Sequence, residues 1–176
     1  MKILTGVPAE RLNDIPSLAQ AAEHNGFSGL STQENRHNPF LPLAIAAVHS
    51  QQLELRTNVA IAFARSPMVA AGLAWDLQYA TAGRFVLGLG SQVKGHNQRR
   101  FSVPWSPPAP RLREYIEAIQ AIWVCWRDGT PLQYEGKHYQ FSLMTPNFTP
   151  EPLTSALPKL HIAAVGPAMM KVAASA

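Results

Sequence analysis

Two segments of the chain place small or polar residues where an apolar run meets a turn, and each could bind a charged ligand. The first is Ala163-Ala-Val-Gly-Pro167, which follows an apolar run and precedes a helical pattern. Small side chains leave the backbone accessible there, and the free N–H groups and positive dipole end of a helix favour an anion. Pro167 suits the first helical position because its missing N–H would be unpaired anyway. The segment predicts an anion site, although tight packing of strand on helix would favour the same residues.

The second segment is Gly83-Arg-Phe-Val-Leu-Gly-Leu-Gly-Ser91, an apolar run that ends in a glycine-bounded turn. Ligands of α/β proteins lie at the carboxyl ends of parallel strands. The dinucleotide fingerprint is incomplete, since Val93 replaces its third glycine, and the P-loop is incomplete, since His96 and Asn97 replace its Lys and Ser/Thr. Gly88 and Gly90 therefore either leave room for a ligand or relieve crowding at a strand end.

Glu34 and His37, three residues apart after another strand-like run, are candidates for a general acid, a general base or a hydrogen-bond donor. His96 and Asn97 are candidates of the same kind, and a solvated loop is the alternative in both places. No group of histidines and carboxylates has metal-binding spacing, so no metal site is expected. Cys125, the only cysteine, is expected on the solvent side of a helix without an adjacent base, which argues against a nucleophile.

Composition favours one soluble globular domain over residues 1–176, with 47% apolar and 15% charged residues. The net charge of +4 without a run of five like charges argues against a nucleic-acid partner. The longest helix-compatible apolar run, 43–48, is too short to span a membrane, and the N-terminus lacks the apolar core of a signal peptide. A cytoplasmic location is expected.

Strand-like and helix-like segments alternate along the chain. The predicted strands cover residues 3–7, 27–31, 53–63, 85–89 and 160–165, and the predicted helices cover about 12–25, 43–51, 68–81 and 111–128. Residues 91–110 are expected to form a long loop, and residues 132–141 a hairpin that turns near Gly136. Repeated β-α units with short connections predict a parallel sheet wound in one hand.

Taken together, three segments resemble the luciferase-like monooxygenase superfamily, and most closely its coenzyme F420-dependent oxidoreductases. They are residues 83–90, the helix 111–126 with Gly129, and Ile162-Ala-Ala-Val-Gly-Pro-Ala-Met169. The resemblance runs along the whole chain in order and includes the hairpin. It implies an α/β fold of the (β/α)8 TIM-barrel type with a flavin or deazaflavin across the carboxyl ends of the strands. Because only five strands are predicted, an incomplete, truncated barrel is expected.

The resemblance also implies site residues by their positions. The segment that matches the family's phosphate-binding residues consists of Ala163, Ala164, Val165, Gly166 and Pro167. The segment that matches a strand bulging toward the ring, often with a cis bond before a residue other than proline, consists of Ala60, Ile61 and Ala62. Positions near the ring match Glu34 and His37, taken as catalytic, together with Gly90, Ser91 and Gln92.

The activity implied by the resemblance is hydride transfer between coenzyme F420, or alternatively FMN, and a small organic substrate. A homodimer is expected, and the activity of a truncated chain stays open. Two other functions are compatible with the residues: an open sheet that binds a phosphate ligand without redox chemistry, and a half-barrel that associates with itself. The second would follow from an exposed sheet edge and an apolar inner face.

Overall fold

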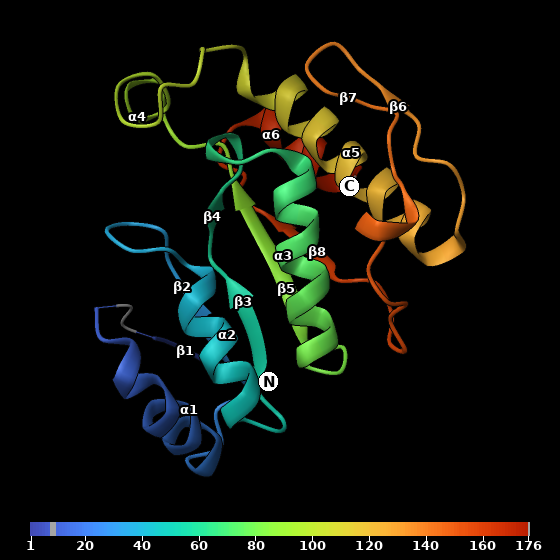
Figure 1. Ribbon diagram of the computed structural model, residues 1–176. Coiled ribbons are helices and arrows are strands. Elements are labelled where there is room, and N and C mark those ends of the chain that lie inside the picture. The colour runs from blue at the N-terminus through green and yellow to red at the C-terminus, as the bar shows by residue number, and fades with distance from the viewer. Residues whose placement is uncertain (8–9, 176) are drawn as a thin grey trace. The chain divides into compact units, whose positions relative to one another are not determined.

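The computed structural model describes residues 1–7 and 10–175 and has the α/β class expected from the sequence. Figure 1 shows the helices and strands of the chain, and contacts divide the chain into two compact units. Unit 1 comprises Met1–Ala60, Leu73–Leu89 and Thr154–Ile162, and unit 2 comprises Ile61–Gly72, Gly90–Leu153 and Ala163–Ala176. Each unit is built from segments that lie far apart in the sequence.

Unit 1 is organised around a parallel sheet, as the alternating pattern predicts. Five of its strands, in spatial order, are β1 (Leu4–Gly6), β2 (Gly29–Thr32), β3 (Glu54–Thr57), β5 (Phe85–Gly90) and β8 (Lys159–Ile162), and the short β4 (Ala60–Ile61) also pairs with β5. Every neighbouring pair in this order is parallel. Over the residues that the structure describes, the sheet stays open and does not close into a barrel.

Helices cover one face of this sheet. Helix α1 (Ile15–His24) and helix α2 (Phe40–His49) pack on each other and on β2, and α2 also contacts β3. The helix-covered face carries Leu30, Leu55 and Phe85, each no more than 1% exposed. Burial of these apolar side chains is the main term that stabilises the layer.

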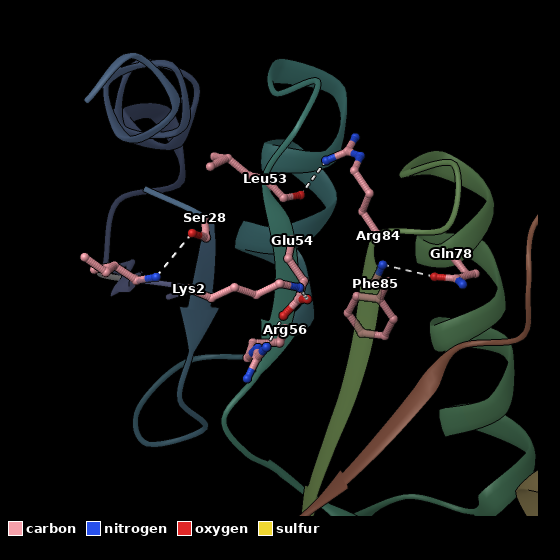
Figure 2. A network of polar contacts seen from close by, with 9 residues as sticks. Lys2, Ser28, Leu53, Glu54, Arg56, Gln78, Arg84 and Phe85 are labelled. Carbon is pink, nitrogen blue, oxygen red and sulfur yellow. Dashed lines mark hydrogen bonds and ion pairs between the residues drawn. The ribbon is translucent and has the colours of Figure 1, made fainter. Parts of the chain in front are cut away.

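The other face of the sheet carries charged side chains. Glu54 and Arg56 alternate with buried Leu55 and Thr57 along β3, and Lys159 and His161 occupy the equivalent face of β8. Lys2 Nζ lies 2.8 Å from Glu54 Oε2, and Arg56 pairs with the other oxygen of the same carboxylate (Figure 2). The expectation of an apolar inner face is therefore wrong, because the period of two along these strands directs ionic side chains to this face.

Strands β3 and β5 approach each other closely at Gly88. The Gly88 N–H donates to Thr57 Oγ1 (2.9 Å), and the Thr57 hydroxyl donates to the Gly88 carbonyl (2.7 Å). A Cβ atom on residue 88 would lie 1.9 Å from the Thr57 carbonyl oxygen. Of the two interpretations of Gly88, the structure supports relief of crowding between strands.

Unit 2 is organised around helix α5 (Pro108–Asp128), which ends at Gly129 with φ +66°. The residues at helical spacing along α5 form a buried stripe, which comprises Leu112, Tyr115, Ile116, Ile119, Ile122, Trp123 and Trp126. Trp123 Nε1 donates to the Ala71 carbonyl (3.2 Å), which satisfies its polar atom inside the core. Helix α6 (Pro167–Ala174) packs on α5. The hairpin is confirmed, with β6 (Tyr134–Glu135) antiparallel to β7 (Gln140–Phe141).

The predicted strand 53–63 is interrupted. Strand β3 ends at Thr57, the Asn58–Val59 peptide is cis, and β4 (Ala60–Ile61) leads into a 3-10 turn over Ala62–Ala64. Phe63 leaves the strand path because its ring packs edge-on against Tyr115, with 6.4 Å between ring centroids. An apolar run looks the same whether it is buried in a strand or in a turn, so periodicity gives no sign of the break.

Three further expectations differ from the structure. The predicted loop 91–110 contains helix α4 (Lys94–Arg99), and α5 begins at Pro108 because prolines are tolerated in a first helical turn. Helix α3 (Pro67–Ala80), by contrast, agrees with the predicted helix 68–81 within one residue at each end. Cys125 is 4% exposed instead of facing solvent, and burial raises the pKa of its thiol. A buried thiol with a raised pKa is a poor nucleophile, so the conclusion drawn from Cys125 is unchanged.

Substituting Gly88→Ala is expected to lower the free energy of unfolding by about 2–3 kcal/mol, because the added methyl group would overlap main-chain atoms of Thr57. Urea unfolding measures the change. Gly72→Ala is the matched control, since a Cβ there meets nothing within 4 Å in α3, and it should raise stability by up to about 1 kcal/mol. Equal unfolding midpoints for Gly88→Ala and the parent protein would contradict the close approach.

His161 should make stability depend on pH. Partial burial, followed by the positive charges of Arg56 and Lys159, lowers the pKa of His161 below its usual value. Because the unfolded chain then binds a proton more readily, stability should fall as the pH drops below about 6.5. Denaturant unfolding at pH 7.5 and 5.5 should show a smaller loss for His161→Gln than for the parent protein. Equal losses would show that His161 titrates alike in both states.

Candidate functional site

In unit 2, two of the predicted cofactor-binding segments begin at neighbouring positions. Strands β5 and β8 run parallel, and Leu89 pairs with Ile162. The next residue of each strand, Gly90 and Ala163, opens the segments 90–92 and 163–167. Because parallel strands end at the same edge of a sheet, both segments start side by side. The structure thus brings together two stretches that lie some seventy residues apart along the chain.

The 163–167 segment is open to solvent and leads directly into helix α6. Val165 is 91% exposed, and Ala163, Gly166 and Pro167 are exposed as well. Gly166 is the N-cap residue without a capping side chain, and a Cβ atom on it would meet nothing within 4 Å. The first N–H groups of α6 are therefore accessible to an anion. The predicted strand through residue 165 is wrong, since β8 ends at Ile162 just before its neighbour β5 ends at Gly90.

The 90–92 segment is fixed by Asn97, whose side chain is 1% exposed. Asn97 Nδ2 donates to the Ser91 carbonyl (3.0 Å), and the Asn97 carbonyl accepts from the Val103 N–H (2.8 Å). Gln92 has φ +57°, an uncommon conformation outside glycine that this anchoring supports. Asn97 Oδ1 is buried without a hydrogen-bond partner in the described part of the chain. The sequence singles out Asn97 as a candidate for the acid, base or hydrogen-bond donor of a site, and its place in the fold makes it a hydrogen-bonding anchor for this loop.

In unit 1, Glu34 and His37 lie in the loop between β2 and α2. Thr32 Oγ1 donates to the Pro39 carbonyl (2.8 Å), and Asn38 Oδ1 accepts from the Phe40 N–H (2.9 Å), so both ends of the loop are tied. His37 is exposed and Glu34 is half-buried. The register of Thr32 with Thr57 places this loop beside the carboxyl end of β3.

A cavity of about 260 Å³ opens at this edge of unit 1. Its lining residues come from the ends of β1 and β2 and the loops that follow, and they are Gly6, Val7, Glu10, Ser31, Gln33, Asn35, Arg36 and His37. Of the two predicted catalytic residues, only His37 lines this cavity. The sequence did not single out Gly6, Val7 and Glu10 as ligands, because nothing in their spacing marks the end of β1 as part of the same edge.

The side chains of Ala60, Ile61 and Ala62 are buried, with exposures of 4% or less. Only their main chain is left to contact a ligand, and the Ile61 carbonyl already accepts from Arg65 Nη1 (3.0 Å). This segment therefore presents no side chain that could contact a ligand.

Residues 1–7 and 10–175 contain neither a candidate metal centre nor a candidate membrane span. Within these ranges, no three or more His, Cys, Asp or Glu side chains are grouped closely enough to hold a metal ion. The same ranges contain no helix with the length and apolar content needed to cross a membrane.

Known proteins resemble the chain over most of its length. An uncharacterized protein of Mycobacterium tuberculosis is 50% identical over 169 residues, which is 96% of this chain and 50% of that protein. A putative coenzyme F420-dependent oxidoreductase of the same species is 34% identical over 131 residues, which is 72% of this chain and 36% of that protein. The chain thus spans half or less of the length of these relatives.

Solved structures of known proteins superpose on nearly the whole chain and so share its fold. The coenzyme F420-dependent tetrahydromethanopterin reductase of Methanopyrus kandleri superposes with a TM-score of 0.76 at 23% identity, over 98% of this chain and 52% of that chain. A monooxygenase component from Pseudomonas putida in complex with FMN superposes with a TM-score of 0.74 at 16% identity, over 92% of this chain and 51% of that chain. Relatives of this fold therefore include F420-dependent and FMN-binding proteins. The luciferase-like monooxygenase family matches residues 2–176, and the chain belongs to that family.

Proposed function

We propose that the chain provides the coenzyme-binding part of an F420-dependent oxidoreductase that transfers hydride between the deazaflavin and a small organic substrate. The observation that carries this proposal is the pairing of Leu89 with Ile162, which sets the 90–92 segment beside the 163–167 segment. An uncapped helix start next to an anchored loop is an arrangement that suits a ligand with a phosphate and a ring.

The residues present fit the phosphate group of such a coenzyme. The exposed, small side chains of the 163–167 segment leave the N–H groups at the start of α6 accessible, and the space around Gly166 is open. Because the helix dipole adds positive potential at this end, a phosphodiester would be stabilised there. When bound, F420 supplies the hydride-accepting ring, and the protein contributes binding, orientation and control of protons.

His37 and Glu34 are proposed to serve the proton chemistry of the reaction. His37 lines a cavity at the carboxyl edge of the sheet, where an imidazole can serve as an acid, a base or a hydrogen-bond donor toward a substrate. Glu34 is half-buried in the same loop, and we assign it a hydrogen-bonding role.

FMN is the alternative cofactor, since it also carries a phosphate that the 163–167 segment could bind. F420 is favoured because the relative that is 34% identical is named as F420-dependent, whereas the FMN complex is 16% identical. Parallel titrations with both cofactors separate the two proposals: tighter binding of FMN would replace F420 in this account.

Substituting Val165→Glu should weaken F420 binding about tenfold or more, equivalent to about 1.4 kcal/mol, because a carboxylate would repel the phosphate. Val165 is 91% exposed, so folding should be unaffected. Fluorescence titration of F420 measures the Kd. Val165→Gln, with the same size and no charge, is the control and should bind nearly as well as the parent protein. A deazaflavin without the phosphate should bind both variants equally, and equal F420 affinities would refute the assignment of this segment.

Substituting Asn97→Asp should lower the free energy of unfolding by about 1–3 kcal/mol, because a buried carboxylate would face the Ser91 carbonyl in place of a donor. At low denaturant, where the variant is still folded, its F420 affinity should also drop. Gln98→Glu makes the same change of charge on the next, exposed residue and should alter neither quantity strongly. Should Asn97→Asp and Gln98→Glu bind F420 equally well, the 90–92 segment lies outside the coenzyme site.

A further inference from the structure

The cavity in unit 1 has a lining unlike that of a pocket for a lipid or an alkane. Val7 provides the one apolar side chain among its lining residues in the described ranges, and the others are polar, charged or glycine. Pockets for drug-sized ligands are mostly apolar and are typically about 300–1,000 Å³ in volume. At about 260 Å³, this cavity suits a smaller and more polar molecule.

The charged residues of the lining restrict the class of ligand further. Arg36 and His37 are consecutive, and both line the cavity. A guanidinium presents a planar fork of donors that matches a carboxylate, and an imidazole can donate a further hydrogen bond. An apolar ligand would remove these groups from water without replacing their hydrogen bonds, which is unfavourable. The pair therefore favours an organic anion.

The remaining lining residues indicate what else the ligand must carry. Glu10 adds a carboxylate to the same cavity, and a second anionic group on the ligand would be repelled by it. A hydroxyl group on the ligand can instead donate to Glu10. Ser31 and Gln33 also line the cavity, and the Gln33 side chain is fixed by a hydrogen bond from Asn35 Nδ2 to Gln33 Oε1 (3.1 Å).

We infer that this cavity binds a small monocarboxylic acid with a hydroxyl or carbonyl group, and that such hydroxy or oxo acids are the substrate class of the enzyme. The assignment to a substrate rests on the proposed function, whereas the binding of the acid rests on the cavity alone. In this inference Arg36 determines the specificity for the carboxylate. His37, the next residue in the chain, lines the same cavity.

The test uses the full chain and pairs of matched probes. Glycolate, lactate, 3-hydroxybutyrate and mandelate are each compared with the corresponding primary amide, which has the same shape without the charge. Saturation-transfer NMR and calorimetry should show that at least one acid binds roughly tenfold or more tightly than its amide, as expected for a charge-assisted contact. Binding of no acid in the panel, or equal binding of every acid and amide, would overturn the inference.

Variants locate the site of binding. Arg36→Ala and Arg36→Gln should both remove the preference for the acid, and because Arg36 is exposed, neither should perturb the melting temperature. Arg127→Ala removes an exposed arginine at the end of α5 and should leave the preference unchanged. A preference that survives both Arg36 variants would show that the acid binds elsewhere and would also overturn the inference.

Titrating F420 in the same samples separates this inference from the proposed function. F420 binding without any preference for the acids would refute the substrate class alone. A preference that depends on Arg36, together with no F420 binding, would leave the acid site in place and refute the oxidoreductase assignment.

Discussion

Strand β5 is held along both of its edges, and the candidate site depends on this double pairing. On one side, the hydroxyl of Thr57 bonds to the main chain of Gly88, at a distance that only a residue without a Cβ permits. On the other side, Leu89 pairs with Ile162. The first contact sets the position of β5 along β3, and the second sets where the chain of β8 leaves the sheet. Together they determine that Gly90 and Ala163 open neighbouring segments.

The open face of the sheet imposes a different constraint. Among the residues that the structure describes, this face carries three cations, Lys2, Arg56 and Lys159, against the one carboxylate of Glu54, so it is positively charged. A second copy of the chain would bring the same excess of cations to a face-to-face contact, which is unfavourable in a medium of low polarity. The idea of a half-barrel that associates through this face is therefore weakened by its own charges, while the parallel order of the strands agrees with the family's barrels.

Much of the fold could be predicted from local patterns. The parallel strands followed from short apolar runs that alternate with helical segments, and the buried face of α5 followed from the spacing of its Leu, Ile and Trp residues. The start of α6 at Pro167 followed from the known preference of proline for the first helical turn. These signals lie within a single element and need no knowledge of distant partners.

The features that could not be predicted are set by contacts between distant segments. The strand predicted over 53–63 stops short of Phe63, whose ring packs on Tyr115, fifty-two residues later. Cys125 is buried by its surroundings in unit 2, although its place on the helical wheel suggested the solvent side. The cavity beside His37 combines the ends of β1 and β2, and its polar lining is apparent only once these ends lie together. For the same reason, Asn97 could be recognised as an anchor only after the loop was seen.

The most direct test of the central claim is an amide NMR titration of the isotope-labelled chain with coenzyme F420. The account predicts that the N–H signals of Ser91 and Gln92 shift at the same coenzyme concentration as those of Ala168 and Met169 at the start of α6. Shifts confined to one of these segments, or no shift in either segment, would contradict a coenzyme site built on the paired ends of β5 and β8.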